Sequence, residues 1–116
     1  MWEKIGDSLS GLRRGWCHDR AIRNHVLFSG IALIALIAAR PPVAWVLSCL
    51  VLLVAGLAAE LVNGAIEALL DRLHPDLHPS IGAAKDMSSA AAFVINVAAA
   101  VILLCAIAVA LAPAHS

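Results

Sequence analysis

Four polar side chains recur at helical spacing inside an otherwise apolar stretch of the chain. Asn63, Glu67 and Asp71 follow Glu60 at intervals of three, four and four residues, which places all four on one face of a helix. An ionisable group at membrane depth costs at least about 2.5–3.5 kcal/mol and usually faces a bundle interior or a site. We therefore expect chemistry on this face. The alternative, that the helix leaves the membrane here and its acids are solvated, applies more to Asp71 than to Glu60.

The two glutamates on this face suit different tasks. Seven residues of helix separate them by about 10 Å, which is too far for the pair alone to chelate one ion. Glu67 is nearer the water and suits Mg²⁺, which takes one or two carboxylates together with substrate phosphates. Glu60 is deeper and suits a general base acting on a lipid hydroxyl. Lys85, followed by Asp86, adds a cation near the same interface, as a phosphate ligand or as a snorkelling anchor.

The composition places these residues in a membrane protein. Of 116 residues, 62% are hydrophobic and only 14% are charged, which leaves too little charge for a soluble surface. The apolar content and the net charge of +0 also exclude a disordered chain. Basic residues flank apolar segments instead of forming a stripe with aromatics, so we expect no nucleic-acid partner. The sequence carries neither a P-loop nor a kinase glycine loop.

Three apolar runs predict three membrane-spanning helices within one domain of residues 1–116. We expect spans at 21–39, 43–70 and 86–112, the second with a cytoplasmic extension. Ser88 and Ser89 are expected to cap the third helix, with contact to a substrate headgroup as the alternative. Inside that helix, Asn96 is expected to make an interhelical hydrogen bond.

The first 17 residues predict an amphipathic helix at the membrane surface. Its apolar residues recur at steps of three and four and are Trp2, Ile5, Leu9, Leu12 and Trp16. A helix packed on its own bundle is the alternative. Seven of the eight basic residues fall on one side of the membrane if the N-terminus and the Arg72–Lys85 connection share that side. We expect that side to be the cytoplasm.

A longer pattern runs through the same residues. Glu60 to Arg72 reads E-x-x-N-x-A-I-E-x-x-x-D-R, and A-K-D follows at Ala84 to Asp86. This pattern resembles the signature of the prokaryotic diacylglycerol kinase family, and Gly11-Leu12-Arg13 also fits that family's N-terminal pattern. The resemblance implies an all-α integral membrane kinase with a surface helix and three membrane helices. It also implies a homotrimer that binds ATP and Mg²⁺ at the cytoplasmic interface.

The resemblance further implies roles for individual residues. Glu60 matches the catalytic base, and Glu67 with Asp19 matches the metal-binding pair, although the family usually has Glu where this chain has Asp19. The residues that match positions around ATP or the transferred phosphoryl group are Asp19, Asn63, Glu67, Asp76, His78, Lys85 and Asp86. The residues that match positions near the lipid are Trp16, Arg23, Glu60 and Ser89.

The expected activity is ATP-dependent phosphorylation of diacylglycerol to phosphatidic acid at the cytoplasmic face of the bacterial inner membrane. His25 stands where many Gram-negative diacylglycerol kinases carry Glu. Residues 19–25 and His78-Pro79 instead resemble the related undecaprenol kinases of Gram-positive bacteria. Undecaprenol is therefore the alternative lipid, and exchanging His25 for Glu is a test of lipid choice. A non-catalytic membrane accessory subunit is a third alternative, from a different functional class.

Overall fold

The chain folds into four helices. The computed structural model describes residues 1–76 and 78–113, and within them it contains no strand. The predicted 1–116 domain also includes residues 77 and 114–116, which lie outside the described residues. The helices are α1 (Trp2–His18), α2 (Arg20–Ala39), α3 (Val43–Leu73) and α4 (Pro79–Leu111). The prediction of an all-α protein is confirmed.

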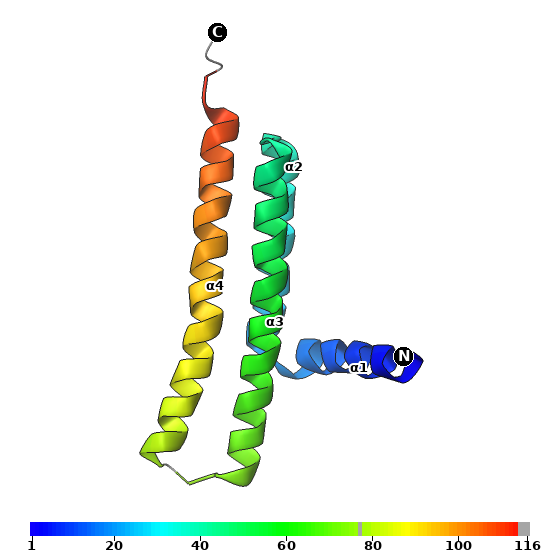
Figure 1. The fold of residues 1–116 in the computed structure, drawn as a ribbon, viewed down its shortest axis with the longest axis vertical. Coiled ribbons are helices and arrows are strands. Elements are labelled where there is room, and N and C mark those ends of the chain that lie inside the picture. The colour runs from blue at the N-terminus through cyan, green and yellow to red at the C-terminus, as the bar shows by residue number, and fades with distance from the viewer. Residues whose placement is uncertain (77, 114–116) are drawn as a thin grey trace.

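Three of the helices are long and apolar enough to cross a membrane. By length and composition these are α2, α3 and α4. They run along the long axis of the molecule, and α1 lies roughly at right angles to them, extending sideways from the N-terminal end of α2 (Figure 1). The connection between α3 and α4 lies at that same end, whereas the connection between α2 and α3 lies at the opposite end. The N-terminal helix and the polar connection therefore share one side of the bundle.

The corner between α1 and α2 is held by two polar side chains. Asp19 is the residue between the helices, and its Oδ1 accepts the N–H of Ala21 at 2.9 Å, which caps the start of α2. Arg23 reaches back from α2, and its Nη1 donates to the carbonyl oxygens of Trp16 at 2.8 Å and Cys17 at 3.2 Å. These carbonyls are in the last turn of α1, where they lack intrahelical donors. Asp19 and Arg23 thus stabilise the turn from which α1 extends away from the bundle.

Helices α3 and α4 pack along a contact surface of small residues, here called the α3–α4 seam. Its buried alanines in α4 recur every seven residues, a period typical of helices that pack at a shallow angle. Small residues let membrane helices approach closely. From α2, Ala32 and Leu36 join the same core. The buried residues of the seam are Cys49, Leu53 and Gly56 of α3 and Ala92, Ala99 and Ala106 of α4.

The last helix begins earlier than residue 86, where the sequence predicted it. It starts at Pro79, and His78 caps it by accepting the N–H of Ser80 at Nδ1, over 3.2 Å. Proline suits a first helical position because the missing N–H would have no intrahelical partner there. Ser88 and Ser89 consequently lie inside α4, and the prediction that they cap this helix is wrong.

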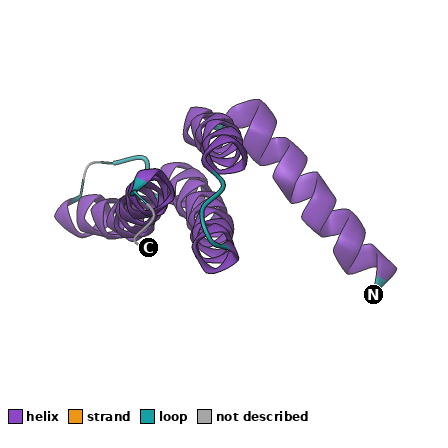
Figure 2. Cartoon of the chain, turned by 90° about the horizontal axis from the view of Figure 1, so that it is seen from above, coloured by secondary structure: helices purple, strands orange, loops and turns teal. Residues whose placement is uncertain are grey.

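Helix α1 buries none of its residues against the rest of the chain. It projects away from the bundle when the molecule is seen from above (Figure 2). The apolar residues of its predicted stripe, from Trp2 to Trp16, are all exposed. Its role as an amphipathic membrane-surface helix stays a prediction.

The close packing of the α3–α4 seam can be tested by enlarging one alanine. Ala106→Leu should lower the free energy of unfolding in detergent by about 1–3 kcal/mol, because Ala106 is fully buried and extra methylenes overpack a filled contact. Ala108→Leu is the matched control, since Ala108 lies exposed on the same helix. The control should change the free energy of unfolding by less than about 0.5 kcal/mol. Equal stabilities for the two variants would contradict the packing described for this surface.

Candidate functional site

The polar face of α3 is turned toward α4. Asn63 is buried, Glu60 and Glu67 are half-buried, and Asp71 is exposed. These residues continue the line of the α3–α4 seam toward the end of the bundle where α1 lies. Along this face, exposure rises from the buried Asn63 through Glu67 to the exposed Asp71.

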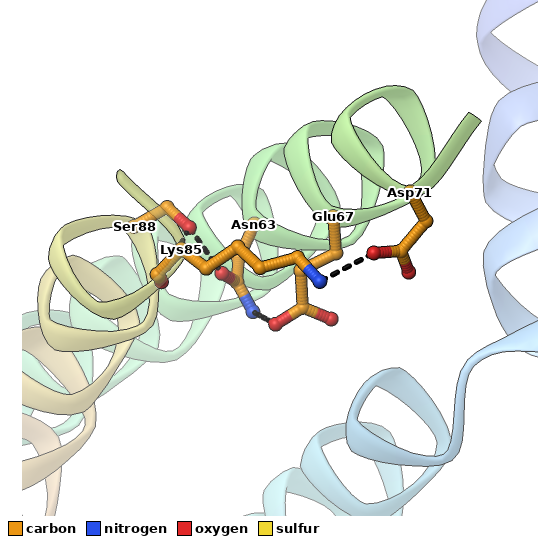
Figure 3. Close-up of polar contacts among 5 residues, drawn as sticks. All are labelled: Asn63, Glu67, Asp71, Lys85 and Ser88. Atoms are coloured by element: carbon orange, nitrogen blue, oxygen red, sulfur yellow. Dashed lines mark hydrogen bonds and ion pairs between the residues drawn. The ribbon is translucent and has the colours of Figure 1, made fainter. Parts of the chain in front are cut away.

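Asn63 links the two helices at the middle of this face. Ser88 of α4 donates its hydroxyl to Asn63 Oδ1 at 2.6 Å. The other end of the amide, Nδ2, donates to Glu67 Oε1 at 3.4 Å, and Figure 3 shows the two contacts in line. Because the Glu67 carboxylate only accepts hydrogen bonds, it faces the Nδ2 end of the amide, and Oδ1 is left to accept the Ser88 hydroxyl. Asn63 thus joins Ser88 of α4 to Glu67 of α3.

Lys85 forms an ion pair with Asp71 at the exposed end of this face (Figure 3). Lys85 lies in the polar first turns of α4, before the apolar run that begins at Ala90. Its hydrogen bond with the Asp71 carboxylate raises the pKa of Lys85, which further favours the charged ammonium. The two side chains are 35% and 64% exposed, and exposed pairs contribute little stability. The main effect of the ion pair is therefore to hold the Lys85 ammonium at the exposed end of this face.

Glu60 lies beside a cavity at the apolar end of this face. Asn96 of α4 donates Nδ2–H to Glu60 Oε1 at 3.0 Å. The interhelical hydrogen bond expected for Asn96 is thus confirmed, and its partner is Glu60. The cavity has a volume of about 460 Å³, and both residues line it together with His25, Phe28 and mostly apolar neighbours. A carboxylate facing an apolar cavity can take a proton from an alcohol that enters there.

Asp19 reaches α3 because residue 64 is glycine. A Cβ at Gly64 would lie 2.5 Å from Asp19 Oδ2, so any larger residue would displace the carboxylate. Glu67 follows Gly64 by three residues, which brings Asp19 within about one helical turn of it along α3. A second cavity of about 750 Å³ opens at this point, lined by Asp19 and Gly64 and by Arg14 and His18 of α1.

These two carboxylates fit the chemistry of a magnesium site. In residues 1–76 and 78–113, no group of three or more His, Cys, Asp or Glu side chains is arranged to hold a metal ion. Mg²⁺ characteristically takes one or two protein carboxylates and completes its shell with phosphate oxygens and water. Asp19 and Glu67 could therefore hold it when a nucleotide supplies the remaining ligands.

The other residues predicted for the site make no side-chain hydrogen bond or ion pair with these groups among the described residues. Trp16 and Arg23 are at the α1–α2 corner, where Arg23 bonds backbone carbonyls. His78 caps α4 through its ring, and its Nδ1 lies 2.7 Å from Ser80 Oγ. The predicted site residues that are exposed and make no side-chain contact described above are Asp76, Asp86 and Ser89.

Comparison with known proteins identifies the family. A family model described as prokaryotic diacylglycerol kinase matches residues 6–107. The chain is also 34% identical to the diacylglycerol kinase of Escherichia coli strain K12, over 83% of this chain and 79% of that protein. The diacylglycerol kinase of Shigella flexneri matches with the same identity and coverage. The chain belongs to the prokaryotic diacylglycerol kinase family. It is therefore a membrane lipid kinase, and its family implies a nucleotide substrate and a divalent metal ion.

Two glycines of this kinase shape the site but were not identified from the sequence. Gly56 and Gly64 lie four residues before and after Glu60, so both occupy its face of α3. Asn96 and His25 lie against Gly56, and Asp19 lies against Gly64. Two glycines one turn to either side of an intramembrane carboxylate were the available signal, because glycine admits a close neighbour. The Ser88 to Asn63 bond left no such signal in the sequence.

The bond from Ser88 to Asn63 can be tested against the next residue. Ser88→Ala leaves the buried Asn63 Oδ1 without its donor, so we expect a loss of about 1–3 kcal/mol in the free energy of unfolding. Ser89→Ala, which alters an exposed hydroxyl one residue further on, should change it by less than about 0.5 kcal/mol. Thermal unfolding in detergent measures both. Similar values for the two variants would mean that the bond does not hold Asn63.

Proposed function

We propose that this kinase transfers the γ-phosphoryl group of ATP to the hydroxyl of diacylglycerol and so forms phosphatidic acid. The observation that carries the proposal is the position of Glu60. Its carboxylate is half-buried, is hydrogen bonded by Asn96 and borders an apolar cavity of about 460 Å³. The polar groups of Asn63, Glu67 and Lys85 follow toward the wet end of the same face. A lipid alcohol and a nucleotide phosphate would thus meet at one line of residues.

The proposed reaction needs little covalent chemistry from the protein. Glu60 accepts or orients the proton of the lipid hydroxyl as its oxygen attacks the γ-phosphorus, and ADP leaves. Glu67 and Asp19 would hold Mg²⁺, which supplies charge neutralisation to the ATP phosphates. Lys85, at the exposed end of the same face, would exchange Asp71 for a phosphoryl oxygen, and Asn63 keeps Glu67 in place. The further residues proposed to contact the nucleotide are Asp76, His78 and Asp86, and those proposed to contact the lipid are Trp16, Arg23 and Ser89.

The proposed location is the inner membrane, with α1 and the α3–α4 connection in the cytoplasm. The concentration of basic residues at this end of the bundle supports that orientation, because cytoplasmic segments carry an excess of Lys and Arg. We also propose a homotrimer. The cavity of about 750 Å³ between α1 and α3 is open to one side, and a neighbouring protomer would help to enclose a nucleotide there.

Undecaprenol is the second candidate for the lipid. His25, one of the residues on which the resemblance to undecaprenol kinases rests, lines the same cavity as Glu60. It lies close enough to the proposed reacting carboxylate to influence which alcohol enters. His25→Glu is a poor exchange for testing this choice, because His25 Nε2 lies 2.8 Å from the Leu53 carbonyl oxygen and a carboxylate would repel it.

The base assignment is tested by Glu60→Gln. We expect the turnover number for lipid phosphorylation to fall by about 10²–10⁴-fold, because the amide cannot accept the hydroxyl proton. The variant should remain folded, since the amide retains an oxygen that accepts the Asn96 N–H. Glu3→Gln, which removes a carboxylate from the exposed first turn of α1, is the matched control and should keep wild-type turnover. Near-normal turnover in Glu60→Gln would eliminate Glu60 as the base.

The choice of lipid is decided by one assay on two alcohols. Purified protein in bilayers is supplied with ATP and with either diacylglycerol or undecaprenol, each with and without Mg²⁺. We expect faster phosphorylation of diacylglycerol, and loss of activity on both lipids when Mg²⁺ is chelated. Faster turnover of undecaprenol would reassign the substrate. Absence of phosphorylation of either lipid would refute the proposed activity and favour an accessory role.

A further inference from the structure

Three helices converge at Gly56. A Cβ at this position would lie 2.6 Å from Asn96 Oδ1 and 2.7 Å from His25 Cε1, so only glycine leaves room for both neighbours. His25 comes from α2, Gly56 from α3 and Asn96 from α4. The contact lies one helical turn from Glu60, deeper in the bundle. We call this group of three residues the Gly56 contact.

The histidine of the Gly56 contact is fixed in place. His25 is only 8% exposed, and its Nε2 lies 2.8 Å from the carbonyl oxygen of Leu53. Because a carbonyl oxygen only accepts hydrogen bonds, Nε2 carries the proton and donates it. The ring therefore cannot swing away to create space on the α2 side of Gly56.

The amide of Asn96 is held with one end satisfied and the other not. Its Nδ2 donates to Glu60, whereas its Oδ1 is buried and has no hydrogen-bond partner among the described residues. The reverse orientation would set the amide oxygen against the Glu60 carboxylate, where two acceptors would repel each other. The contact with Glu60 thus determines the orientation of Asn96, at the cost of an unsatisfied buried oxygen.

Packing alone does not account for an asparagine at this position. The neighbouring buried positions of α4 on the same seam are Ala92 and Ala99. An alanine at residue 96 would fill the position without the unpaired Oδ1, but it would leave Glu60 Oε1 without its donor. Among the described residues, the bond to Glu60 is therefore what offsets the cost of this polar side chain in a membrane helix. What the asparagine adds is a donor aimed at Glu60.

We propose that Asn96 is a positioning residue for phosphoryl transfer, and that Gly56 makes its position possible. The bond from Nδ2 occupies Glu60 Oε1 and holds the side chain, so that the other carboxylate oxygen can meet the alcohol in the cavity beside it. Asn96 acts through Glu60 and does not itself take the proton. This inference rests on the proposed role of Glu60 and extends it to residues that the sequence pattern of the family did not indicate.

The first test measures kinetics of Asn96→Leu and of the smaller Asn96→Ala, in full-length protein in bilayers with diacylglycerol and ATP. Both variants lose the donor to Glu60. We expect kcat to fall by about 10–100-fold, because misplacing a reacting group by about 1 Å has effects of this size. KM for ATP should stay within about twofold, since nothing that holds the nucleotide has changed. Wild-type kcat in either variant would overturn the proposal.

The glycine is tested with a matched control. Gly56→Ala should reduce kcat to a similar degree, because the new methyl group displaces Asn96. Gly30→Ala adds the same methyl group to α2, where no atom lies within 4 Å, and should leave kcat unchanged. Equal kcat for these two variants would show that the Gly56 contact does not control Glu60.

A double-mutant cycle separates positioning from a general loss of structure. In Glu60→Asp the carboxylate is one methylene shorter and falls short of the Asn96 amide. Adding Asn96→Leu to that variant should then lower kcat by less than about threefold, because interacting residues are not additive. A full 10–100-fold loss in the Glu60→Asp background would mean that Asn96 acts independently of Glu60. If wild-type protein phosphorylates no lipid, the proposed function fails first, so the two failures are distinct.

Discussion

The close approach of α3 and α4 is the constraint on which the rest of this structure depends. A helix that carries Glu60, Asn63 and Glu67 out of apolar surroundings must turn these groups toward another helix, because hydrocarbon offers them no hydrogen bonds. Small residues on the α3–α4 seam let the two backbones approach so that short polar side chains reach across. One surface thus holds the helices together and arranges the polar groups.

The residues along this surface change from apolar to charged between one end of the bundle and the other. At the apolar end, Cys49 and Ala106 are packed without polar contacts. Next come Glu60 with its partner from α4 and the cavity beside it, then Asn63 and Ser88, and finally the exposed pair of Asp71 and Lys85. A lipid alcohol stays near the membrane, whereas a nucleotide stays in water, so a kinase acting on both needs such a gradient. Its family membership agrees with this arrangement.

Two glycines decide which neighbours reach this polar face. Gly64 admits the carboxylate of Asp19 from the α1–α2 corner, and Gly56 admits the side chains of His25 and Asn96. Both lie one turn from Glu60, toward water and toward the membrane interior respectively. The two glycines of α3 therefore shape the site as much as the polar residues of that helix do.

The sequence by itself determined the membrane class, the helical content and the polar face of α3, because apolar content and helical period are local properties of the chain. It misplaced the start of α4, since Pro79 is compatible both with a connection and with a first helical turn. Only the tertiary structure decided which groups meet. The bonds from Ser88 to Asn63 and from Asn96 to Glu60 join residues 25 and 36 positions apart. Such contacts depend on the rotation and register of one helix against another, which periodicity within each helix leaves open.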